Sequence, residues 1–258
     1  MREFEEFGRF EIYSNKESGL CGVKTMTLIT AMKAENSIIM ASDSRTYVDP
    51  SGYNDNQKKL FIINNFVIGI IGDGEIGLSL MRTHKKTLID DNFPIDLLAK
   101  NIAGKFSESY GTWFSKIPIN KRPNINFILA GYTNEKTPNN EAIIYSFDHK
   151  KEFCPCLAAE NPVFGGCLQY ATYLCSKYYS LNISPKKAVH LSAYLITETA
   201  SRELLVGGKV HIIEILPTKP PEELGDVEIN KIILANNSFN TNIQNVFNNF
   251  NTSSVVQT

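Results

Sequence analysis

The sequence predicts an α+β protein in which runs of strands alternate with pairs of helices. Short apolar segments bounded by turn residues fill the region from Thr27 to Gly72, and two helical patterns follow them. The same succession of strands and then two helices recurs between residues 126 and 199, before a last strand at Val210–Leu216. Two sheets packed face to face, each with a helix pair on its outer side, would use all of these elements.

Size and composition are those of a soluble globular protein. The chain has 258 residues, of which 43% are hydrophobic and 21% charged. One domain of this length is the ordinary expectation for an α/β-containing protein. A net charge of −1 gives no electrostatic reason to expect nucleic acid or an anionic membrane as a partner. No apolar run approaches the roughly 18 residues of a membrane span, and the first residues are too acidic for a signal peptide. A cytoplasmic location is therefore expected.

The cysteines are odd in number and irregularly spaced, which is typical of reduced thiols in an intracellular protein. The pair Cys154-Pro-Cys156 resembles half of a metal site, but no second pair or nearby histidine completes it. We therefore expect neither a metal nor a cofactor. The five cysteines are Cys21, Cys154, Cys156, Cys167 and Cys175.

In the first half of the chain, two strand pairs precede two helices. Turn residues separate the members of each strand pair, at Glu35-Asn36-Ser37 and at Asn64-Asn65. Tyr47–Gln57 is polar and rich in turn residues, and predicts a loop. The expected strands are Thr27–Ala34, Ser37–Ala41, Lys59–Ile63 and Phe66–Ile71, and the expected helices run from Glu75 to about Asp90 and from Pro94 through Ile95, Leu98, Ile102 and Phe106.

The second half repeats this order and ends in a polar tail. Ser184-Pro185 has the form of an N-cap followed by proline at the first helical position. Ala235–Thr258 contains eight asparagines among few apolar residues, so we expect a mobile segment there. The expected elements are strands at Asn126–Tyr132, Ala142–Phe147 and Pro162–Gly166, helices at Leu168–Tyr179 and from Pro185 to Thr199, and the strand Val210–Leu216.

Three chemically complementary residues are expected at one end of this arrangement. Thr27 opens the first strand, Asp43 follows the second strand in the segment Asp43-Ser44-Arg45, and Lys59 opens the third. Asp43 comes sixteen residues after Thr27, and Lys59 sixteen after Asp43. Pairing the first two strands as a hairpin brings the start of one near the end of the other. A hydroxyl, a carboxylate and an amine can then meet at one sheet end.

This ordered set resembles the active site of the proteasome β-type N-terminal nucleophile (Ntn) hydrolases. That family has a threonine opening the first strand, an Asp-x-Arg-x-Thr-like segment and then Lys-Lys-aromatic. The corresponding residues here are Thr27, Asp43-Ser44-Arg45-Thr46 and Lys58-Lys59-Leu60-Phe61, with Ala31 as the expected small residue and Gly72 as the expected glycine. The resemblance runs almost to residue 216. It does not extend to the proteasome α-type subunits, whose N-terminal Tyr-Asp-Arg and Ser-Pro-Asp-Gly segments are missing.

The resemblance implies a four-layer αββα sandwich and a threonine-type amidohydrolase, most simply a peptidase. It divides the chain into an N-terminal extension or propeptide (1–26), an Ntn hydrolase domain (27–216) and a polar, Asn-rich C-terminal extension (217–258). It further implies a peptide or protein substrate, assembly into a homo-oligomeric ring and an ATPase partner that delivers substrate.

The chemistry that the resemblance implies depends on a free N-terminus at the threonine. A threonine hydroxyl is a weak nucleophile until a base takes its proton, and the α-amine of an N-terminal threonine can do so. The pKa of such an amine is about 7.7–8.0, and a neighbouring ammonium, Lys59, lowers it. Asp43 would hold Lys59 in place, and the Gly72 amide would donate to the oxyanion.

The N-terminus departs from the family pattern. Twenty-six residues precede Thr27, and Met26 stands where self-processing members have glycine. Three explanations are open: translation begins at Met26 and methionine removal exposes Thr27, the chain cleaves itself, or the extension stays and the site is inactive. Thr25 is a rival nucleophile, but it would require a two-residue insertion in the hairpin.

Two supporting segments depart as well. The family has Gly-Ser-Gly and, later, Arg-Asp-Ser-x-Ser-Gly-Gly, whose serines and aspartate support the threonine. The best matches here are Gly165-Gly166-Cys167 and the segment from Arg202 to Gly208. Gly166 and Val206 lack the hydroxyls, while Glu203 keeps the carboxylate on a longer side chain.

Each candidate residue also has a purely structural explanation. Threonine favours strands, Asp43 and Arg45 would make an ordinary surface pair, and Lys58-Lys59 would be solvated charge. The runner-up function is accordingly a non-catalytic, proteasome-like scaffold subunit in which the retained extension blocks Thr27. The candidate site residues are Thr27, Asp43, Lys59, Arg45, Gly72 and Glu203.

Overall fold

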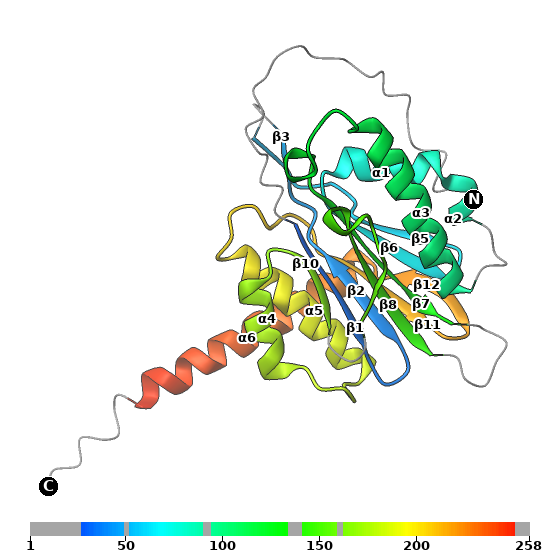
Figure 1. Cartoon of the computed structure of the whole chain (residues 1–258). Helices are drawn as coiled ribbons and strands as arrows, with labels where there is room; N and C mark the ends of the chain where they lie inside the picture. Colours follow the sequence, from blue (N-terminus) through cyan, green and yellow to red (C-terminus); the bar gives the residue numbers. More distant parts are fainter. Residues whose placement is uncertain (1–26, 49–51, 90–93, 134–140, 159–161, 251–258) are drawn as a thin grey trace, which may run out of the picture.

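The computed structural model describes residues 27–48, 52–89, 94–133, 141–158 and 162–250 (Figure 1). The extension expected at residues 1–26, with the rival Thr25, lies outside these ranges, as do the last eight residues. Among the described residues, no helix is long and apolar enough to cross a membrane.

Two five-stranded antiparallel sheets form the centre of the molecule. The first has the strand order β10-β1-β2-β11-β12 and the second β5-β6-β7-β8-β9, while β3 and β4 pair as a separate hairpin. The strands are β1 (Leu28–Lys33), β2 (Ile38–Ser42), β3 (Thr46–Val48), β4 (Gly52–Asn54), β5 (Leu60–Ile63), β6 (Phe66–Gly72), β7 (Ile125–Tyr132), β8 (Ala142–Asp148), β9 (Cys156–Leu157), β10 (Val163–Gly166), β11 (His211–Leu216) and β12 (Lys219–Glu223).

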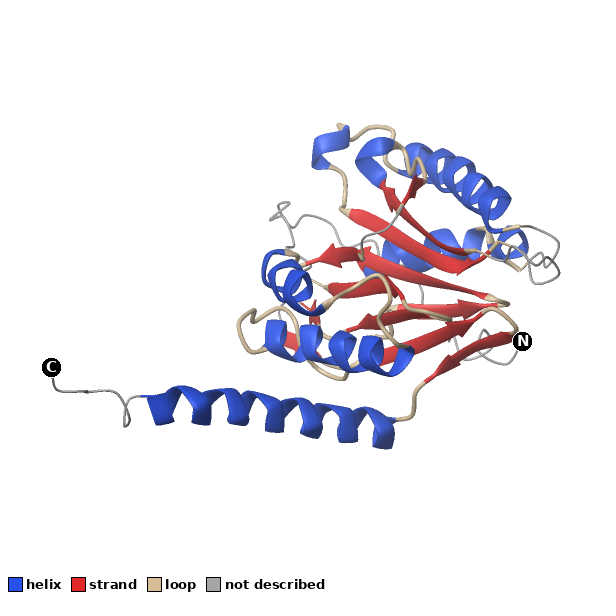
Figure 2. Cartoon of the chain, turned by 90° about the horizontal axis from the view of Figure 1, so that it is seen from below, coloured by secondary structure: helices blue, strands red, loops and turns tan. Residues whose placement is uncertain are grey.

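Helices cover both outer faces, so the architecture is the four-layer αββα sandwich that the resemblance implied (Figure 2). The helices α1 and α3 pack on the second sheet, and α4 and α5 on the first. The helices are α1 (Gly74–Thr83), α2 (Lys85–Leu88), α3 (Ile95–Trp113), α4 (Gln169–Tyr178), α5 (Pro185–Ala200) and α6 (Asp226–Phe250), with 3₁₀ turns at Ile119–Lys121 and His149–Lys151.

Alternation along the strands divides the apolar residues among three buried layers. On β1, Ile29 and Ala31 face the second sheet, whereas Leu28 and Met32 face α4 and α5. Ile29 belongs to the layer between the sheets, which β6, β7 and β8 complete from the opposite side. Because both faces of the strands are buried, β1 and β2 are apolar at nearly every position, as expected for sheets covered on two sides.

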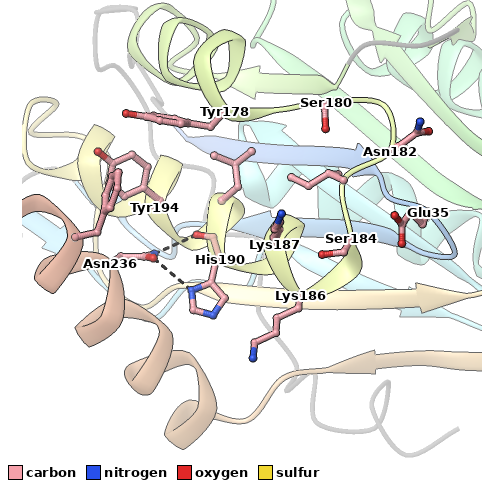
Figure 3. A pocket seen from close by; sticks show the side chains of 13 residues that line it. Glu35, Tyr178, Ser180, Asn182, Ser184, Lys186, Lys187, His190, Tyr194 and Asn236 are labelled. Atoms are coloured by element: carbon pink, nitrogen blue, oxygen red, sulfur yellow. Dashed lines mark hydrogen bonds between the residues drawn. The ribbon is translucent and has the colours of Figure 1, made fainter.

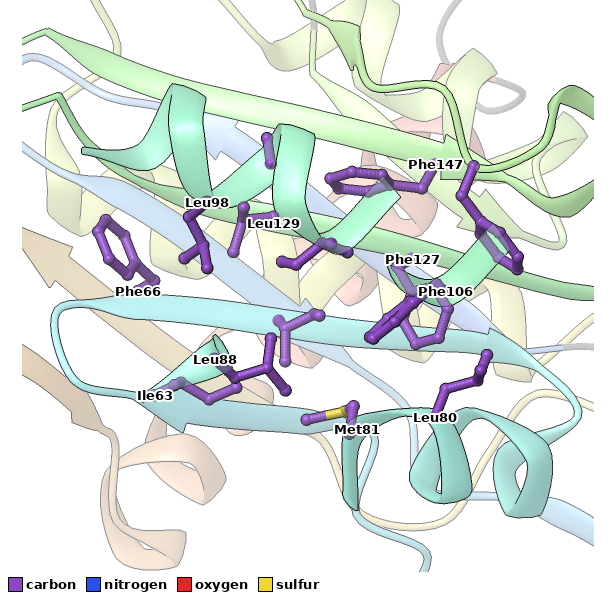
Figure 4. Close-up of a cluster of buried hydrophobic side chains, with 14 of the residues drawn as sticks. Ile63, Phe66, Leu80, Met81, Leu88, Leu98, Phe106, Phe127, Leu129 and Phe147 are labelled. Atoms are coloured by element: carbon purple, nitrogen blue, oxygen red, sulfur yellow. The ribbon is translucent and has the colours of Figure 1, made fainter. Parts of the chain in front are cut away.

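The outer layer of the second sheet is rich in phenylalanine (Figure 4). Phe106 of α3 packs against Phe127 of β7 with ring centroids 4.9 Å apart, and Phe153 completes the cluster. On α3 itself, the buried residues Ile95, Leu98, Ile102 and Phe106 recur at helical spacing, as the sequence predicts. The cluster fixes α3 on the sheet.

Two elements of the first half differ from the sequence-based expectation. The polar stretch read as a loop contains the hairpin β3–β4, with Tyr47 opposite Tyr53 in edge-to-face contact. The first helix does not continue to about Asp90, because the chain breaks at His84. The His84 ring forms a 2.8 Å hydrogen bond with the Ser109 hydroxyl and lies near Phe106. These contacts with α3 hold the break between α1 and α2 in place.

The chain beyond Pro217 is more ordered than expected, and the segment expected to be mobile from Ala235 onward is helical as far as Phe250. β12 adds to the edge of the first sheet, and α6 follows it. Ile229 and Ile232 of α6 are buried in the same layer as α5. The asparagine-rich composition predicts a mobile segment from Ala235 onward, but the helix that these two isoleucines anchor on α5 continues through Ala235 to Phe250.

A small charged cluster holds β12 beside β11 and β5. The Glu223 carboxylate accepts from His211 Nδ1 at 2.8 Å and from Lys58 Nζ at 3.3 Å. The hydrogen bond from His211 is the main cause that holds the pKa of Glu223 below its ordinary value, with the Lys58 charge adding to it against the opposing effect of burial.

Replacing Glu223 with glutamine is expected to lower the free energy of unfolding by about 1 kcal/mol at pH 7. Since the pKa of Glu223 is lower in the folded chain, its stabilising contribution is fully present above the unfolded pKa and is lost as pH falls through the folded one. The difference between the two proteins in chemical denaturation should therefore shrink below about pH 4.5. Glu222→Gln, at the exposed neighbouring position, is the control, and an equal loss there would contradict the assignment.

Candidate active site

Thr27 and Asp43 lie at the same edge of the first sheet. β1 and β2 are antiparallel, with Ile29 opposite Ser42, so the residue before β1 meets the residue after β2. The Asp43 amide donates to the Leu28 carbonyl over 3.1 Å. Thr27 is 5% exposed and Asp43 is fully buried. The hairpin register alone thus places the hydroxyl residue beside the carboxylate.

The Asp43 carboxylate accepts four hydrogen bonds. Its Oδ1 accepts from the Leu28 amide at 3.0 Å and from Lys59 Nζ at 2.7 Å. Its Oδ2 accepts from the Arg45 amide at 3.2 Å and the Gly207 amide at 3.1 Å. A buried carboxylate needs such compensation, because burying an unpaired charge is costly. One side chain therefore joins three segments that are far apart in the sequence.

Lys59 reaches this edge from the second sheet, where it directly precedes β5. Besides Asp43, its Nζ donates to the Arg45 carbonyl over 2.6 Å. Burial lowers the pKa of Lys59, and the Asp43 charge and hydrogen bond oppose that shift. Since Asp43 Oδ1 also binds the peptide N–H directly after Thr27, the buried amine is fixed next to the start of β1.

The Arg45 side chain points away from the Asp43–Lys59 pair. It forms two hydrogen bonds with Asp55, Nε to Oδ1 at 2.7 Å and Nη2 to Oδ2 at 2.9 Å, and lies over the Tyr53 ring. Its Nη1 donates to the Leu204 carbonyl over 2.9 Å. Arg45 therefore contributes a main-chain carbonyl to the Lys59 site, while its guanidinium ties the β3–β4 hairpin to the segment after α5.

Gly72 ends β6 with a φ of +95°, where a Cβ would overlap the Asn124 carbonyl oxygen. The next residue, Asp73, donates its amide to the same carbonyl over 2.8 Å and caps α1 by accepting from the Ile76 amide. Among the described residues, no hydrogen bond joins Gly72 to the Asp43–Lys59 pair. Its expected role as an oxyanion donor stays a prediction.

Glu203 lies against Cys167, and Cys167 lies against Thr27. The Cys167 amide donates to the Thr27 carbonyl over 2.8 Å. Burial, and after it the charge and hydrogen bond of the Glu203 carboxylate, raise the pKa of the Cys167 thiol. Glu203 is thus connected to the start of β1 through one intervening side chain.

Gly166 and Val206 stand where the family has hydroxyl residues, and the structure shows how each is packed. Gly166, at a φ of +95°, pairs with Leu28, and a Cβ there would overlap the Thr27 carbonyl oxygen. Val206 is fully buried in the layer beneath α4 and α5. The β10 chain therefore approaches Thr27 so closely that only glycine fits at 166.

Three residues of this region were not predicted from the sequence: Asp55, Gly207 and Cys167. Asp55 lies in the stretch for which the sequence predicts a loop. No local pattern indicates that its carboxylate pairs with Arg45. Gly207 was noted only within the segment from Arg202 to Gly208, although its amide donates to Asp43. Cys167 was noted as part of a glycine-containing match, but its contact with Glu203 depends on the fold.

A surface hollow of about 850 Å³ lies elsewhere, around Glu35 in the β1–β2 turn, Lys186 of α5 and Phe239 of α6 (Figure 3). Glu35 is at the opposite end of β1 from Thr27, and none of the candidate site residues lines the hollow. Within the described ranges, no group of three or more histidine, cysteine or acidic side chains could hold a metal ion.

Sequence comparison finds one family match. Residues 23–215 match the family described as proteasome subunit. No curated protein sequence matches the chain at a significant level.

Solved structures of Anbu proteins share the fold. The helical assembly of the Anbu complex from Pseudomonas aeruginosa gives a TM-score of 0.72, and Anbu (ancestral beta-subunit) from Yersinia bercovieri 0.71, each with 14% identity over 86% of this chain and 96% of theirs. The Anbu (Gly-1) mutant from Hyphomicrobium sp. strain MC1 gives 0.68, also with 14% identity, over 86% of this chain and 97% of that one. At this identity the likeness concerns the fold.

Proposed function

Because this chain belongs to the proteasome subunit family, we propose that it is a threonine-type peptidase with Thr27 as its nucleophile. One observation supports this above the others: Asp43 Oδ1 binds both Lys59 Nζ and the amide that directly follows Thr27. A buried ammonium is difficult to explain as a solvated surface charge, and it lies where the chemistry of an N-terminal threonine needs one.

In the proposed mechanism, Thr27 is the first residue of the active chain. Its α-amine takes the hydroxyl proton while Oγ attacks the carbonyl carbon of the substrate peptide. The Gly72 amide donates to the oxyanion. The C–N bond then breaks, the leaving amine receives the proton, and an ester joins the acyl group to Thr27. Water, activated by the same α-amine, hydrolyses this ester and restores the free hydroxyl.

The other candidate residues support that reaction through Thr27. The Lys59 ammonium favours the neutral α-amine by lowering its pKa, and Asp43 holds Lys59 in place. Arg45 positions Lys59 through its carbonyl. Glu203 acts through Cys167, whose amide holds the Thr27 carbonyl. Arg45 and Glu203 are thus proposed as positioning residues.

The second candidate function is that of a non-catalytic scaffold subunit. Met26 precedes Thr27, and while it remains attached the Thr27 nitrogen is an amide without usable basicity. In both cases we propose that the chain assembles with copies of itself, since the Pseudomonas aeruginosa relative forms a helical assembly. A homo-oligomeric ring and an ATPase partner belong to the same proposal.

A labelling experiment tests the peptidase function. The full-length chain and a chain that begins at Met26 are expressed where the initiator methionine is removed, and the intact mass of each is measured. Each is then treated with a peptide electrophile that reacts with N-terminal threonine. The chain that begins at Thr27 is expected to gain the mass of one inhibitor, on the Thr27 peptide, and a chain that retains Met26 is expected to gain none.

Thr27→Ala in the shorter chain is the control and should remove the label. This chain also lacks Thr25, which therefore cannot substitute. If the trimmed and assembled protein neither reacts nor cleaves any member of a broad peptide panel, the scaffold function replaces the peptidase function.

A further inference from the structure

Helix α6 extends beyond the rest of the molecule. Figures 1 and 2 both show its C-terminal half running out past the sandwich, away from the sheets. Its first half lies along α5, where Asn236 donates to the His190 carbonyl over 3.1 Å and Asn240 accepts from the Tyr194 hydroxyl at 3.0 Å. The element therefore has two halves, one packed on its own chain and one projecting from it.

A single apolar stripe runs through both halves. Its members are separated by alternating steps of three and four residues, with Asn236 at one position, and such spacing places them on one face of a helix. In the first half the stripe is buried against α5, whereas in the second half it is open: Val246 is 54% exposed, and its neighbour Phe247 is 67% exposed. The stripe consists of Ile229, Ile232, Phe239, Ile243 and Val246.

The second half has little intrinsic tendency to be helical. Four of its ten residues from Thr241 to Phe250 are asparagine, which ranks low in helix propensity. Isolated helices of this length are marginal in water, and most helical stability in proteins comes from packing an amphipathic face. A helical segment of this composition with an open apolar stripe is expected to pack on another surface.

We propose that the projecting half of α6 is an interface between two copies of this chain, in which the α6 stripes pack antiparallel. No charged residue follows Lys231, so this surface offers no charge to attract an ionic partner, nor like charges to repel a second copy. An antiparallel pair is self-complementary and opposes the two helix dipoles. It also keeps the two sandwiches at opposite ends, whereas a parallel pair would run into the α5 layers that cover the first halves.

The overlap spans about twelve residues, or roughly 18 Å of helix. Such an interface is at the low end of interface sizes, below roughly 1,200 Å² of buried surface. We therefore expect a dissociation constant on the order of 1–100 µM for this contact alone. The contact does not depend on the proposed peptidase activity.

Sedimentation of the full chain across that concentration range tests the interface. The wild-type average mass should rise with concentration from the 28.9 kDa of one chain, or from that of any assembly built through other surfaces. Val246→Asp combined with Phe247→Asp should weaken this association at least about tenfold, because the change places one charge in the stripe and a second beside it. Gln244→Asp combined with Asn248→Asp adds the same charge to the opposite, polar face and should leave the association unchanged.

A cross-linking experiment tests whether a second copy of the chain packs on this stripe. Ile243→Cys, in the part of the stripe that lies on the projecting half, should form an oxidative dimer through residue 243, whereas Asn248→Cys on the polar face should not. Three results would overturn the proposal: an average mass that does not depend on concentration, stripe variants that associate like wild type, or loss of association without a cross-link at residue 243. The first result would point to a segment of the same chain as the occupant, and the third to a different surface.

Discussion

Replacing Asp43 with asparagine is expected to lower the free energy of unfolding by about 3–5 kcal/mol and to abolish the proposed activity. Each carboxylate oxygen accepts two hydrogen bonds from N–H groups. In either orientation, the asparagine side chain would therefore turn its NH₂ group toward two other donors. The buried Lys59 ammonium also loses its counter-charge. Chemical denaturation and peptide cleavage by the trimmed chain measure the two effects.

Asp55→Asn is the matched control for this change. Asp55 also pairs with a cation, Arg45, but its side chain is 45% exposed. We expect this control to lose no more than about 1 kcal/mol. If the two variants are equally stable, the four hydrogen bonds to Asp43 do not hold this edge together, and the positioning of Lys59 needs another cause.

Replacing Lys59 with alanine is expected to lower kcat/KM by on the order of 10²–10⁴-fold with only a modest loss of stability. The activity loss follows from the proposed effect of the ammonium on the Thr27 amine. The stability loss is modest because burial of this ammonium is itself unfavourable, as its lowered pKa indicates, and Asp43 keeps three amide donors. Measurements use the trimmed chain at saturating and limiting substrate.

Lys58→Ala is the control for the loss of a neighbouring positive charge. Lys58 pairs with Glu223 at 3.3 Å and lies outside the Asp43 hydrogen bonds. Activity should be retained in this variant. Wild-type turnover by Lys59→Ala, or an equal loss in Lys58→Ala, would show that the lysine assignment is wrong.

The pH dependence of the free energy of unfolding is a second test of the buried Lys59 ammonium. Since its pKa is lower in the folded chain, the folded state releases this proton at a lower pH than the unfolded state does. The unfavourable contribution is present in full below the folded pKa and diminishes as pH rises toward about 10.5, the unfolded value. The corresponding rise in stability should be missing in Lys59→Ala.

The sheets and the outer helices could be predicted from the sequence because local pattern and burial agree there. β1 and β2 are continuous apolar runs between polar turns, and α3 repeats its apolar residues at helical spacing. The order of these strands and helices along the chain predicts most of the topology. The register of the β1–β2 hairpin then follows from its short turn, and it brings Thr27 and Asp43 together.

What the sequence did not reveal depends on contacts between distant segments. The β3–β4 hairpin contains Gly52 and Asn54, which disfavour strands, and it is secured by the Arg45–Asp55 pair instead of by its own propensity. The order in α6 comes from isoleucines buried on α5, against a composition that suggests a mobile segment. Likewise, no local pattern indicates that the Gly207 amide donates to Asp43.

The four hydrogen bonds of Asp43 also determine when in folding the candidate site can form. The Gly207 amide lies 164 residues after Asp43, and Lys59 directly precedes β5 of the opposite sheet. Contacts of such sequence separation form late, since the intervening chain must first lose its freedom. An incompletely folded chain, or one still emerging from the ribosome without its last strands, has neither a fixed ammonium nor a fixed carboxylate. If Thr27 is the nucleophile that we propose, its chemistry would be withheld until the whole sandwich has closed, and neighbouring unfolded chains would be protected from it.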